Sequence, residues 1–493
     1  MCISLAIIKT ISQKHIILKK LTAYLFIFAL LFSTYSFSQY NIKVKVNNLA
    51  NTDLYLGFHY GTRLSIIDTS KINKNGIAIF NGKHKLNGGI YFIAFPSNNY
   101  FDFLINENTN FKISTDTTDF LNHLSFENST ENQLFLDYQK TSLFFRNQME
   151  HEYSKLEKYK NIPDSINNIK SKIEIISKNM KIYKANISTK NSSTLFAKII
   201  YTLSEPLVPK PELSELKDYD VNPDSVLNLY SYTYYKNHYF DHFDFSDTRM
   251  LYTSILPKKI STFYSNIVDP SPDSLRLETI KLINKSFVKE ESYRFTLNYL
   301  IKMFETSGEF PNNELFVMLA EKYYLNNKAN WVSQEFLKQL KLRVEALKPN
   351  IVGKIAPALN LLTDKDEAFS LNNIKDKYIV LYFWDTNCEH CKINTPIVHK
   401  IAKKYKDEIE FISVYTQIEK TKWLEYIKEN KLNSWTNIFD KDGSSNMFIN
   451  YDLYKTPRIY ILDKDKKIIE KEIEAKDLEE FIENLEKCKR TKK

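Results

Sequence analysis

Glycine and cysteine are both scarce in this chain. Only 9 of the 493 residues are glycine and 4 are cysteine. A scaffold held together by disulfides needs many more cysteines, so the fold must depend on its hydrophobic cores. Six glycines lie from Gly57 to Gly89, and none lies between Gly89 and Gly308. This distribution separates a turn-rich N-terminal region from a long region that lacks glycine turns.

Acidic residues are missing from the first 38 residues. This segment contains four lysines and an apolar run from Leu21 to Phe32, followed by small polar residues. The pattern predicts a secretory signal peptide over residues 1–38, cleaved before Gln39. An uncleaved anchor is the alternative, but the twelve residues of the run are fewer than the ~20 that span a bilayer. We therefore expect an exported protein of the periplasm or cell envelope, with no stable membrane span after cleavage.

A concentrated basic surface is also missing. The formal net charge is +9, and loss of the four lysines in the first segment leaves +5. No cluster combines basic with aromatic residues, so nucleic acid is not an expected partner. The chain is 43% apolar and 14% aromatic, and its length exceeds what one core usually organises. Several folded domains are therefore expected.

Three sequence patterns follow one another along the mature chain. Short alternating apolar runs between glycine turns predict an antiparallel β-sandwich over residues 39–122. Apolar residues at helical spacing predict an all-helical domain over 125–348. Alternating strand and helix patterns predict an α/β domain over 350–488, ahead of a basic tail at 489–493.

The α/β region contains three apolar runs of strand length, at 378–384, 410–414 and 458–462. The first run is apolar throughout, which is typical of a strand buried on both faces. Between the first two runs, apolar residues from Ile393 to Tyr405 recur at helical spacing, with lysines between them. We expect an amphipathic helix there.

Two cysteines, Cys388 and Cys391, stand between the first strand and this helix. Unpaired N–H groups and the dipole at a helix N-terminus would stabilise the thiolate of Cys388, as a nucleophile requires. Cys391, one turn on, is within reach for a disulfide. A protonated His390 would make that disulfide more oxidising, and Glu389 would oppose this effect. We predict a redox centre with catalytic Cys388 and Cys391, tuned by Glu389 and His390.

A second motif, Thr456-Pro457, stands directly before the strand at 458–462. Proline cannot donate a hydrogen bond within a sheet, and a cis peptide bond at such a place marks a functional site. We predict that Pro457 is cis and faces the cysteines.

The stretches FWDTNCEHCK, TPRIYILDKDKKII and VGKIAPALNL resemble the TlpA/ResA type of envelope thioredoxin-like oxidoreductase. The resemblance covers about 350–488 and implies a thioredoxin fold with nucleophilic Cys388 and resolving Cys391. It implies no cofactor. The expected partners are thiols or disulfides of envelope proteins and a membrane or periplasmic electron donor. The substrate groove that it implies includes Trp384, Thr456 and Pro457.

The regions before residue 350 resemble those of exported Bacteroidota proteins that carry a β domain and a helical domain of unknown function ahead of such a module. Three positions of the α/β region depart from the family pattern. Asn387 stands where the family often has tryptophan, and Asn394 stands where its cytochrome-maturation members carry a buried glutamate. Tyr382 stands where plain thioredoxins keep an aspartate. The usual proton-handling carboxylate is therefore missing or replaced, with Asp385 as the candidate substitute.

Other readings of these residues are less favoured. A zinc site needs four ligands, but only Cys488 and His399 lie near the pair in sequence, and His399 is about two turns further along the helix. A peroxidatic cysteine usually follows a threonine by three residues, and Thr386 is only two before Cys388. His238 and His242 have a spacing that a metal could use, although helix packing is favoured. No metal is expected.

The sequence thus predicts a thiol-disulfide oxidoreductase of the cell envelope, and the resemblance to the TlpA/ResA type favours the reductase direction. The alternative is a non-catalytic binding or assembly protein that uses its thioredoxin-like module as a docking platform.

Overall fold

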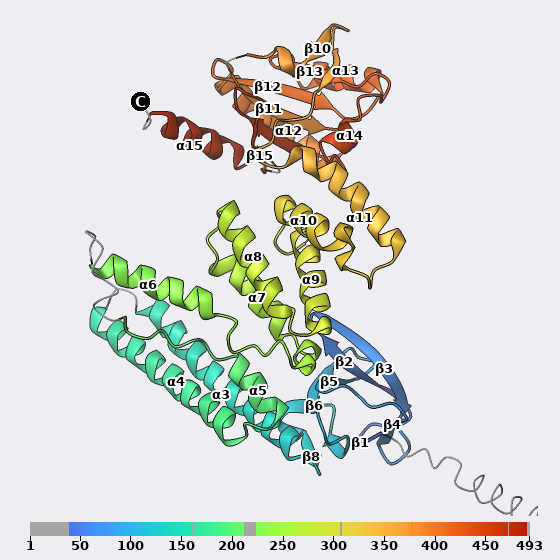
Figure 1. Ribbon diagram of the computed structural model, residues 1–493, viewed down its shortest axis with the longest axis vertical. Coiled ribbons are helices and arrows are strands. Elements are labelled where there is room, and N and C mark those ends of the chain that lie inside the picture. Colours follow the sequence, from blue (N-terminus) through green and yellow to red (C-terminus); the bar gives the residue numbers. More distant parts are fainter. Residues whose placement is uncertain are drawn as a thin grey trace, which may run out of the picture. The chain divides into compact units, whose positions relative to one another are not determined.

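The computed structural model describes residues 39–159, 162–211, 223–305, 308–375, 377–471 and 473–490 (Figure 1). The predicted signal peptide, the end of the basic tail and the side chain of Cys488 lie outside the described part. The chain divides into two compact units between Ile267 and Val268. This division falls inside the region predicted to form one helical domain, and the predicted domain boundaries stay predictions.

The first unit begins with two four-stranded sheets that enclose a common core. Strand β1 alternates buried and exposed residues, and its Ile42, Val44 and Val46 are completely buried. One sheet has the order β4 (Ile77–Gly82), β1 (Tyr40–Val46), β7 (Asn110–Thr115), β8 (Ser125–Glu127). The other has the order β3 (Arg63–Lys71), β2 (Asp53–Tyr60), β5 (Gly89–Ala94), β6 (Tyr100–Ile105).

Two details differ from the expected antiparallel sandwich and helical region. Strands β1 and β7 pair in parallel, so their sheet is mixed. They are far apart in the sequence, and a long crossover through the other sheet permits parallel pairing where a tight hairpin would not. Strand β8 lies at the start of the stretch predicted to be helical, and it pairs with β7 in antiparallel fashion.

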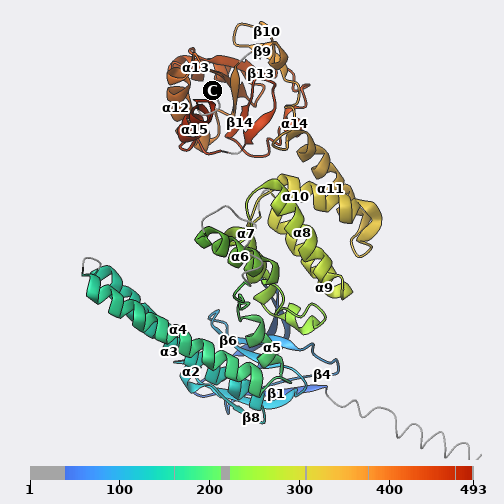
Figure 2. The ribbon, with the colours of Figure 1, turned by 60° about the vertical axis from the view of Figure 1, so that its left-hand side comes forward.

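Helices complete the first unit. The long α3 and α4 run side by side in both Figures 1 and 2. The buried Asn132 of α3 bonds to both the N–H and the C=O of Leu104, which satisfies the backbone of edge strand β6. The helical elements are α2 (Phe120–His123), α3 (Thr130–Lys158), α4 (Pro163–Lys190), α5 (Leu195–Thr202), α6 (Pro223–His238), the 3₁₀ turn η2 (Thr248–Tyr252) and α7 (Ile255–Asn266).

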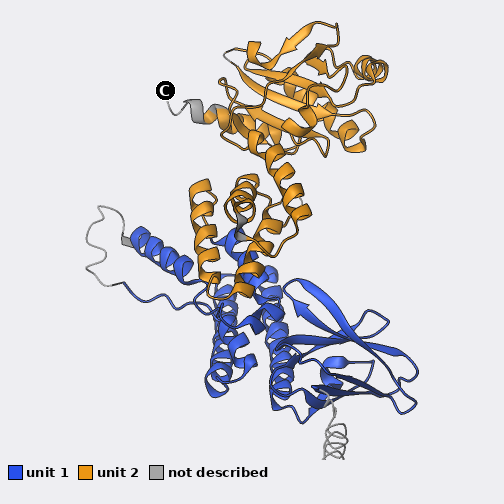
Figure 3. Ribbon diagram, turned by 45° about the vertical axis from the view of Figure 1, so that its right-hand side comes forward, with its two compact units in different colours: residues 1–267 blue, residues 268–493 orange. Residues whose placement is uncertain are grey.

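The second unit, orange in Figure 3, begins with helices and continues into a seven-stranded sheet. Ser333 caps α11 by accepting a hydrogen bond from the Phe336 N–H, and a 3₁₀ turn that contains Pro349 follows the helix. The elements before the sheet are α8 (Pro272–Ser286), α9 (Glu290–Phe304), α10 (Asn313–Leu319), the π-helical η3 (Ala320–Lys328), α11 (Gln334–Leu347) and η4 (Lys348–Asn350).

The sheet is mixed, as an α/β fold of the thioredoxin type requires. Its three central strands β13, β12 and β11 are parallel, and β14 and β15 form an antiparallel hairpin beside β11. In order across the sheet, the strands are β10 (Ala368–Ser370), β9 (Asn360–Thr363), β13 (Thr436–Phe439), β12 (Ile409–Tyr415), β11 (Tyr378–Trp384), β14 (Arg458–Leu462) and β15 (Ile468–Lys471). The helical elements here are η5 (Leu371–Asn373), α12 (Glu389–Lys404), α13 (Lys420–Glu429), α14 (Met447–Asn450) and α15 (Leu478–Arg490).

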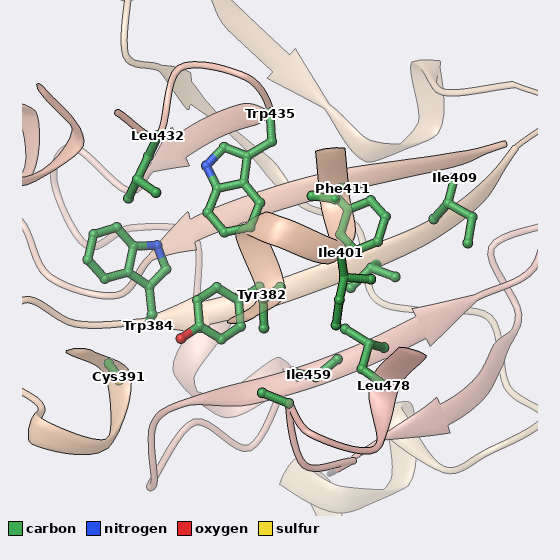
Figure 4. Packing of buried hydrophobic residues seen from close by; sticks show 14 of the residues in the cluster. Tyr382, Trp384, Cys391, Ile401, Ile409, Phe411, Leu432, Trp435, Ile459 and Leu478 are labelled. Carbon is green, nitrogen blue, oxygen red and sulfur yellow. The ribbon is translucent and has the colours of Figure 1, made fainter. Parts of the chain in front are cut away.

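Strand β11 is buried on both faces and supplies both cores of this domain. Val380, Tyr382 and Trp384 belong to the core on one face, together with residues of α12, α13 and α15. Figure 4 shows Tyr382 and Trp384 in this core with Ile401 of α12 and Leu478 of α15. Ile379 and Phe383 point to the other face, toward α14. The continuous apolar run therefore reflects burial on two sides, as predicted. Within the described residues, no helix is long and apolar enough to cross a membrane.

Candidate active site

The end of β11 and the start of α12 place Cys388 at the N-cap of the helix. Its backbone is extended, with φ −90° and ψ 114°, and its Sγ accepts a hydrogen bond from the Cys391 N–H at 3.2 Å. The predicted position of Cys388 at the helix N-terminus is therefore confirmed. Such an N–H donor favours negative charge on the sulfur.

Thr456 and Pro457 approach the same sulfur from the loop before β14. Their peptide bond is cis, and the Cys388 Sγ–H donates to the Thr456 carbonyl oxygen at 3.3 Å. The predicted cis peptide bond of Pro457 is confirmed, and the neighbouring Thr456 contacts Cys388. That Pro457 itself faces the cysteines, and that the motif forms part of a substrate groove, stay predictions. A carbonyl acceptor favours the neutral thiol, so it opposes the effect of the Cys391 N–H.

The second cysteine has a different environment. Both thiols are free, Cys388 is partly exposed and Cys391 is completely buried. Burial raises the pKa of the Cys391 thiol, and its hydrogen bond with Cys388 raises this pKa further. Cys391 is therefore a neutral thiol at neutral pH, while Cys388 is the sulfur that a second protein can reach.

The remaining predicted site residues differ in exposure. Glu389 is exposed and pairs with Lys392 at 2.6 Å, and His390 is exposed beside it. Their tuning roles stay predictions. Trp384 does not line a groove as predicted. It is completely buried, and its indole N–H donates to Ser413 Oγ at 2.7 Å, because it is the last core residue of β11.

The candidate proton-handling residue, Asp385, is engaged elsewhere. One carboxylate oxygen accepts from the Asn387 N–H at 2.8 Å and the other from Gln417 Nε2 at 3.1 Å. The carboxylate therefore stabilises the turn between β11 and α12. These contacts give no support for proton transfer by Asp385.

Sequence reasoning missed a pair of buried hydroxyl groups beneath Cys391. Thr395 Oγ1 donates to the Cys391 carbonyl oxygen at 2.7 Å, and Tyr382 OH lies 2.9 Å from the same Oγ1, to which it donates. The Tyr382 hydroxyl points to the side of the cluster where Cys391 lies (Figure 4). Burial raises the pKa of Tyr382, so both groups are neutral at neutral pH. The available signal was the spacing, because Thr395 follows Cys391 by one helical turn.

We expect Thr395→Val to lower the free energy of unfolding by about 1–3 kcal/mol, because the buried Tyr382 hydroxyl loses its Thr395 acceptor. Urea denaturation at neutral pH would measure the change. Tyr382→Phe in the Thr395→Val background should restore part of the loss. Equal stabilities of Thr395→Val and wild type would contradict this account of the pair.

Other possible ligands make ordinary contacts. His238 pairs with Asp241 at 2.6 Å, and His242 Nδ1 lies 2.9 Å from Ser204 Oγ. The buried His399 lies 2.6 Å from Ser434 Oγ. In the described part of the chain, no three His, Cys, Asp or Glu side chains are arranged to hold a metal ion.

Known protein families match three parts of the chain. A family described as thioredoxin-like matches residues 376–468, which include both cysteines and the Thr456-Pro457 motif. Two domains of unknown function, DUF4369 and DUF5106, match residues 40–135 and 223–350. The first of these covers the two sheets of the N-terminal unit, and the second ends at η4.

Individual proteins are similar to the C-terminal part of this chain. The chain is 31% identical over 114 residues to the thioredoxin-like protein YneN of Bacillus subtilis. This alignment covers 23% of this chain and 65% of YneN. It is 26% identical over 137 residues to the thiol-disulfide oxidoreductase ResA of Bacillus cereus. This alignment covers 28% of this chain and 78% of ResA. A solved domain of a possible thiol-disulfide isomerase from Cytophaga hutchinsonii is 33% identical to this chain, with a TM-score of 0.28. The alignment covers 29% of this chain and 98% of that domain.

The fold, the two neighbouring cysteines and the relatives lead to one assignment. The C-terminal domain of this chain belongs to the thioredoxin-like thiol-disulfide oxidoreductases, with ResA among its relatives, and it follows two domains of unknown function.

Proposed function

We propose that this protein reduces disulfides of other proteins in the cell envelope. The Cys388 thiolate attacks one sulfur of a substrate disulfide, so that the substrate S–S bond breaks and a mixed disulfide forms. The other substrate sulfur leaves as a thiolate and takes up a proton from water. Cys391 then loses its proton and attacks Cys388 Sγ, and the leaving substrate thiolate takes up a proton. The substrate ends as two thiols and the protein as a Cys388–Cys391 disulfide, which a dithiol electron donor must reduce again.

Two groups that contact one partly exposed sulfur support this proposal most directly. Cys388 Sγ is partly exposed, lies 3.2 Å from the Cys391 N–H and lies 3.3 Å from the Thr456 carbonyl oxygen. An exposed nucleophile with a buried partner thiol one turn away is what a two-step exchange needs. The predicted signal segment supports a place in the periplasm or cell envelope, where thiols and disulfides of envelope proteins would be the substrates.

The direction of electron flow is open to measurement. We expect a reduction potential of the Cys388–Cys391 couple below about −200 mV, in the range of reductases rather than of strong oxidants such as DsbA. Equilibration with glutathione or dithiothreitol buffers, followed by mass spectrometry of the alkylated protein, would determine it. A potential near −120 mV would reverse the proposed direction while leaving the exchange chemistry intact.

A docking function is the second candidate, and one observation favours it. Strand β3 is at the edge of its sheet, and its Leu64 and Ile66 are 50% and 59% exposed. Edge strands with exposed apolar residues can pair with a strand of another protein. Equal capture of envelope proteins by wild type and by a variant without both active-site cysteines would favour docking over catalysis.

A further inference from the structure

The loop that carries Thr456 is attached to the helix before the thioredoxin-like domain. Asp452 begins this loop, and its side chain is only 1% exposed. The guanidinium of Arg343, on α11, binds both carboxylate oxygens of Asp452, with Nη2 and Oδ2 3.2 Å apart. A two-point contact of this kind holds both position and orientation. Arg458 Nη1 lies further from the carboxylate, at 3.8 Å.

A second contact joins the same helix end to the start of the loop. Asn350, in η4, is completely buried. Its side-chain amide donates to the Asn450 carbonyl oxygen at 3.1 Å and accepts from Lys471 Nζ at 2.9 Å. The guanidinium of Arg343 also lies 5.6 Å from the ring centre of Tyr454. Residues of α11 and η4 therefore hold the loop at several points.

The other end of the loop reaches the nucleophile. Only three residues separate Asp452 from Thr456, and the Thr456 carbonyl oxygen accepts from Cys388 Sγ at 3.3 Å. Tyr460 OH fixes the residue before Asp452, because it donates to the Tyr451 carbonyl oxygen at 2.6 Å. A change at Asp452 thus has a short path to the carbonyl group beside Cys388.

We infer that Arg343 and Asn350 are positioning residues, through which the DUF5106 region sets the Thr456 carbonyl against Cys388. The inference gives that region a role in the redox chemistry, and it rests on the proposed function of the two cysteines. Both residues lie within the stretch that matches the domain of unknown function, 223–350. Neither touches a sulfur, so each acts through the loop.

The inference has a definite direction. The Thr456 carbonyl accepts a hydrogen bond from the thiol and disfavours the thiolate. If the loop is released, this acceptor moves away and Cys388 Sγ loses the hydrogen-bond partner that favours its neutral thiol form. Alkylation of Cys388 should then become about three- to fivefold faster at a fixed pH. The Cys388–Cys391 disulfide should also become more oxidising, because its reduced form is stabilised.

The experiment uses the full mature chain with Arg343→Ala. Iodoacetamide alkylation of Cys388 is followed by peptide mass spectrometry, which separates it from Cys488, and the reduction potential is measured in parallel. Removal of Arg343 leaves the buried Asp452 charge with a poorer partner, which costs stability. Arg343→Ala, Asp452→Asn therefore serves as the second variant, because it releases the loop without that charge.

Lys348→Ala is the matched control. Lys348 is in η4, and its ion pair at 2.7 Å is with Glu321 rather than with the loop. Faster alkylation and a higher potential in the loop variants, but not in this control, would support the inference. Unchanged values in folded loop variants, or equal changes in the control, would overturn it. Insulin reduction by the wild type is measured separately. Failure of the wild type to reduce insulin would contradict the proposed function, whereas unchanged values in the loop variants would contradict only this inference.

Discussion

Replacement of both active-site cysteines, Cys388→Ser and Cys391→Ser, is expected to slow disulfide reduction at least about 10³-fold, which corresponds to about 4 kcal/mol in the activation barrier. A serine hydroxyl does not ionise near neutral pH, so no nucleophile remains at the start of α12. Insulin reduction with dithiothreitol as the electron source measures the rate. Cys488→Ser is the matched control and should keep the wild-type rate.

The single replacement Cys391→Ser separates the two steps. Cys388 can still attack a substrate disulfide, but the buried thiol that releases the product is missing, so mixed disulfides should accumulate. Non-reducing gels of envelope extracts would show bands that dithiothreitol removes. If the double variant reduced insulin as fast as wild type, catalysis by this cysteine pair would be refuted and the docking function would gain support.

The burial of Cys391 should also be visible in the alkylation of the reduced protein. Near pH 7, we expect iodoacetamide to modify Cys388 and to leave Cys391 unmodified until the protein is denatured. Cys391 is completely buried, and burial raises the pKa of its thiol above the ordinary value of 9.0. A neutral, inaccessible thiol is a poor nucleophile. Alkylation of both thiols at equal rates in the native protein would contradict this expectation.

The same shift predicts a loss of stability at high pH. Because the folded state holds the Cys391 proton more tightly than the unfolded state, its contribution is complete below about pH 9 and decreases as the pH rises above that value. The loss is at most about 1.4 kcal/mol for each pH unit. Urea denaturation of reduced wild type and Cys391→Ser between pH 8 and 10 isolates the effect, since other groups titrate equally in both. Parallel pH profiles would show that Cys391 is not the source.

Local patterns sufficed for much of the C-terminal domain. The run from Tyr378 to Trp384 was predicted as a buried strand with the bounds that β11 has. Because this strand ends four residues before Cys388 and a helix pattern follows, the sequence places Cys388 at the start of the helix. In the N-terminal unit the pattern indicated two sheets of short strands, but not the parallel pairing of β1 with β7. Pairing between distant strands depends on the path of the chain between them. The alternation of apolar and polar residues within one strand carries no information about that path.

Contacts between distant residues were beyond the reach of the sequence. The sequence marks Tyr382 only as a departure from the aspartate of plain thioredoxins, whereas the hydrogen bond of its hydroxyl with Thr395 depends on the packing of β11 against α12. The burial of Trp384 overturned its predicted place in the groove for the same reason. Side chains acquire such partners from packing, which periodicity in one segment cannot specify.

The amino-acid order by itself determined the chemistry at the start of α12, because a cysteine at a helix N-cap and a second one turn later need only local geometry. The tertiary structure alone decided which surroundings these sulfurs have. It brought the Thr456 carbonyl to Cys388, and it joined Arg343 to Asp452 across 109 positions of the chain. Such contacts arise when separate segments bury their surfaces together, so they follow from the packed fold and not from any one segment.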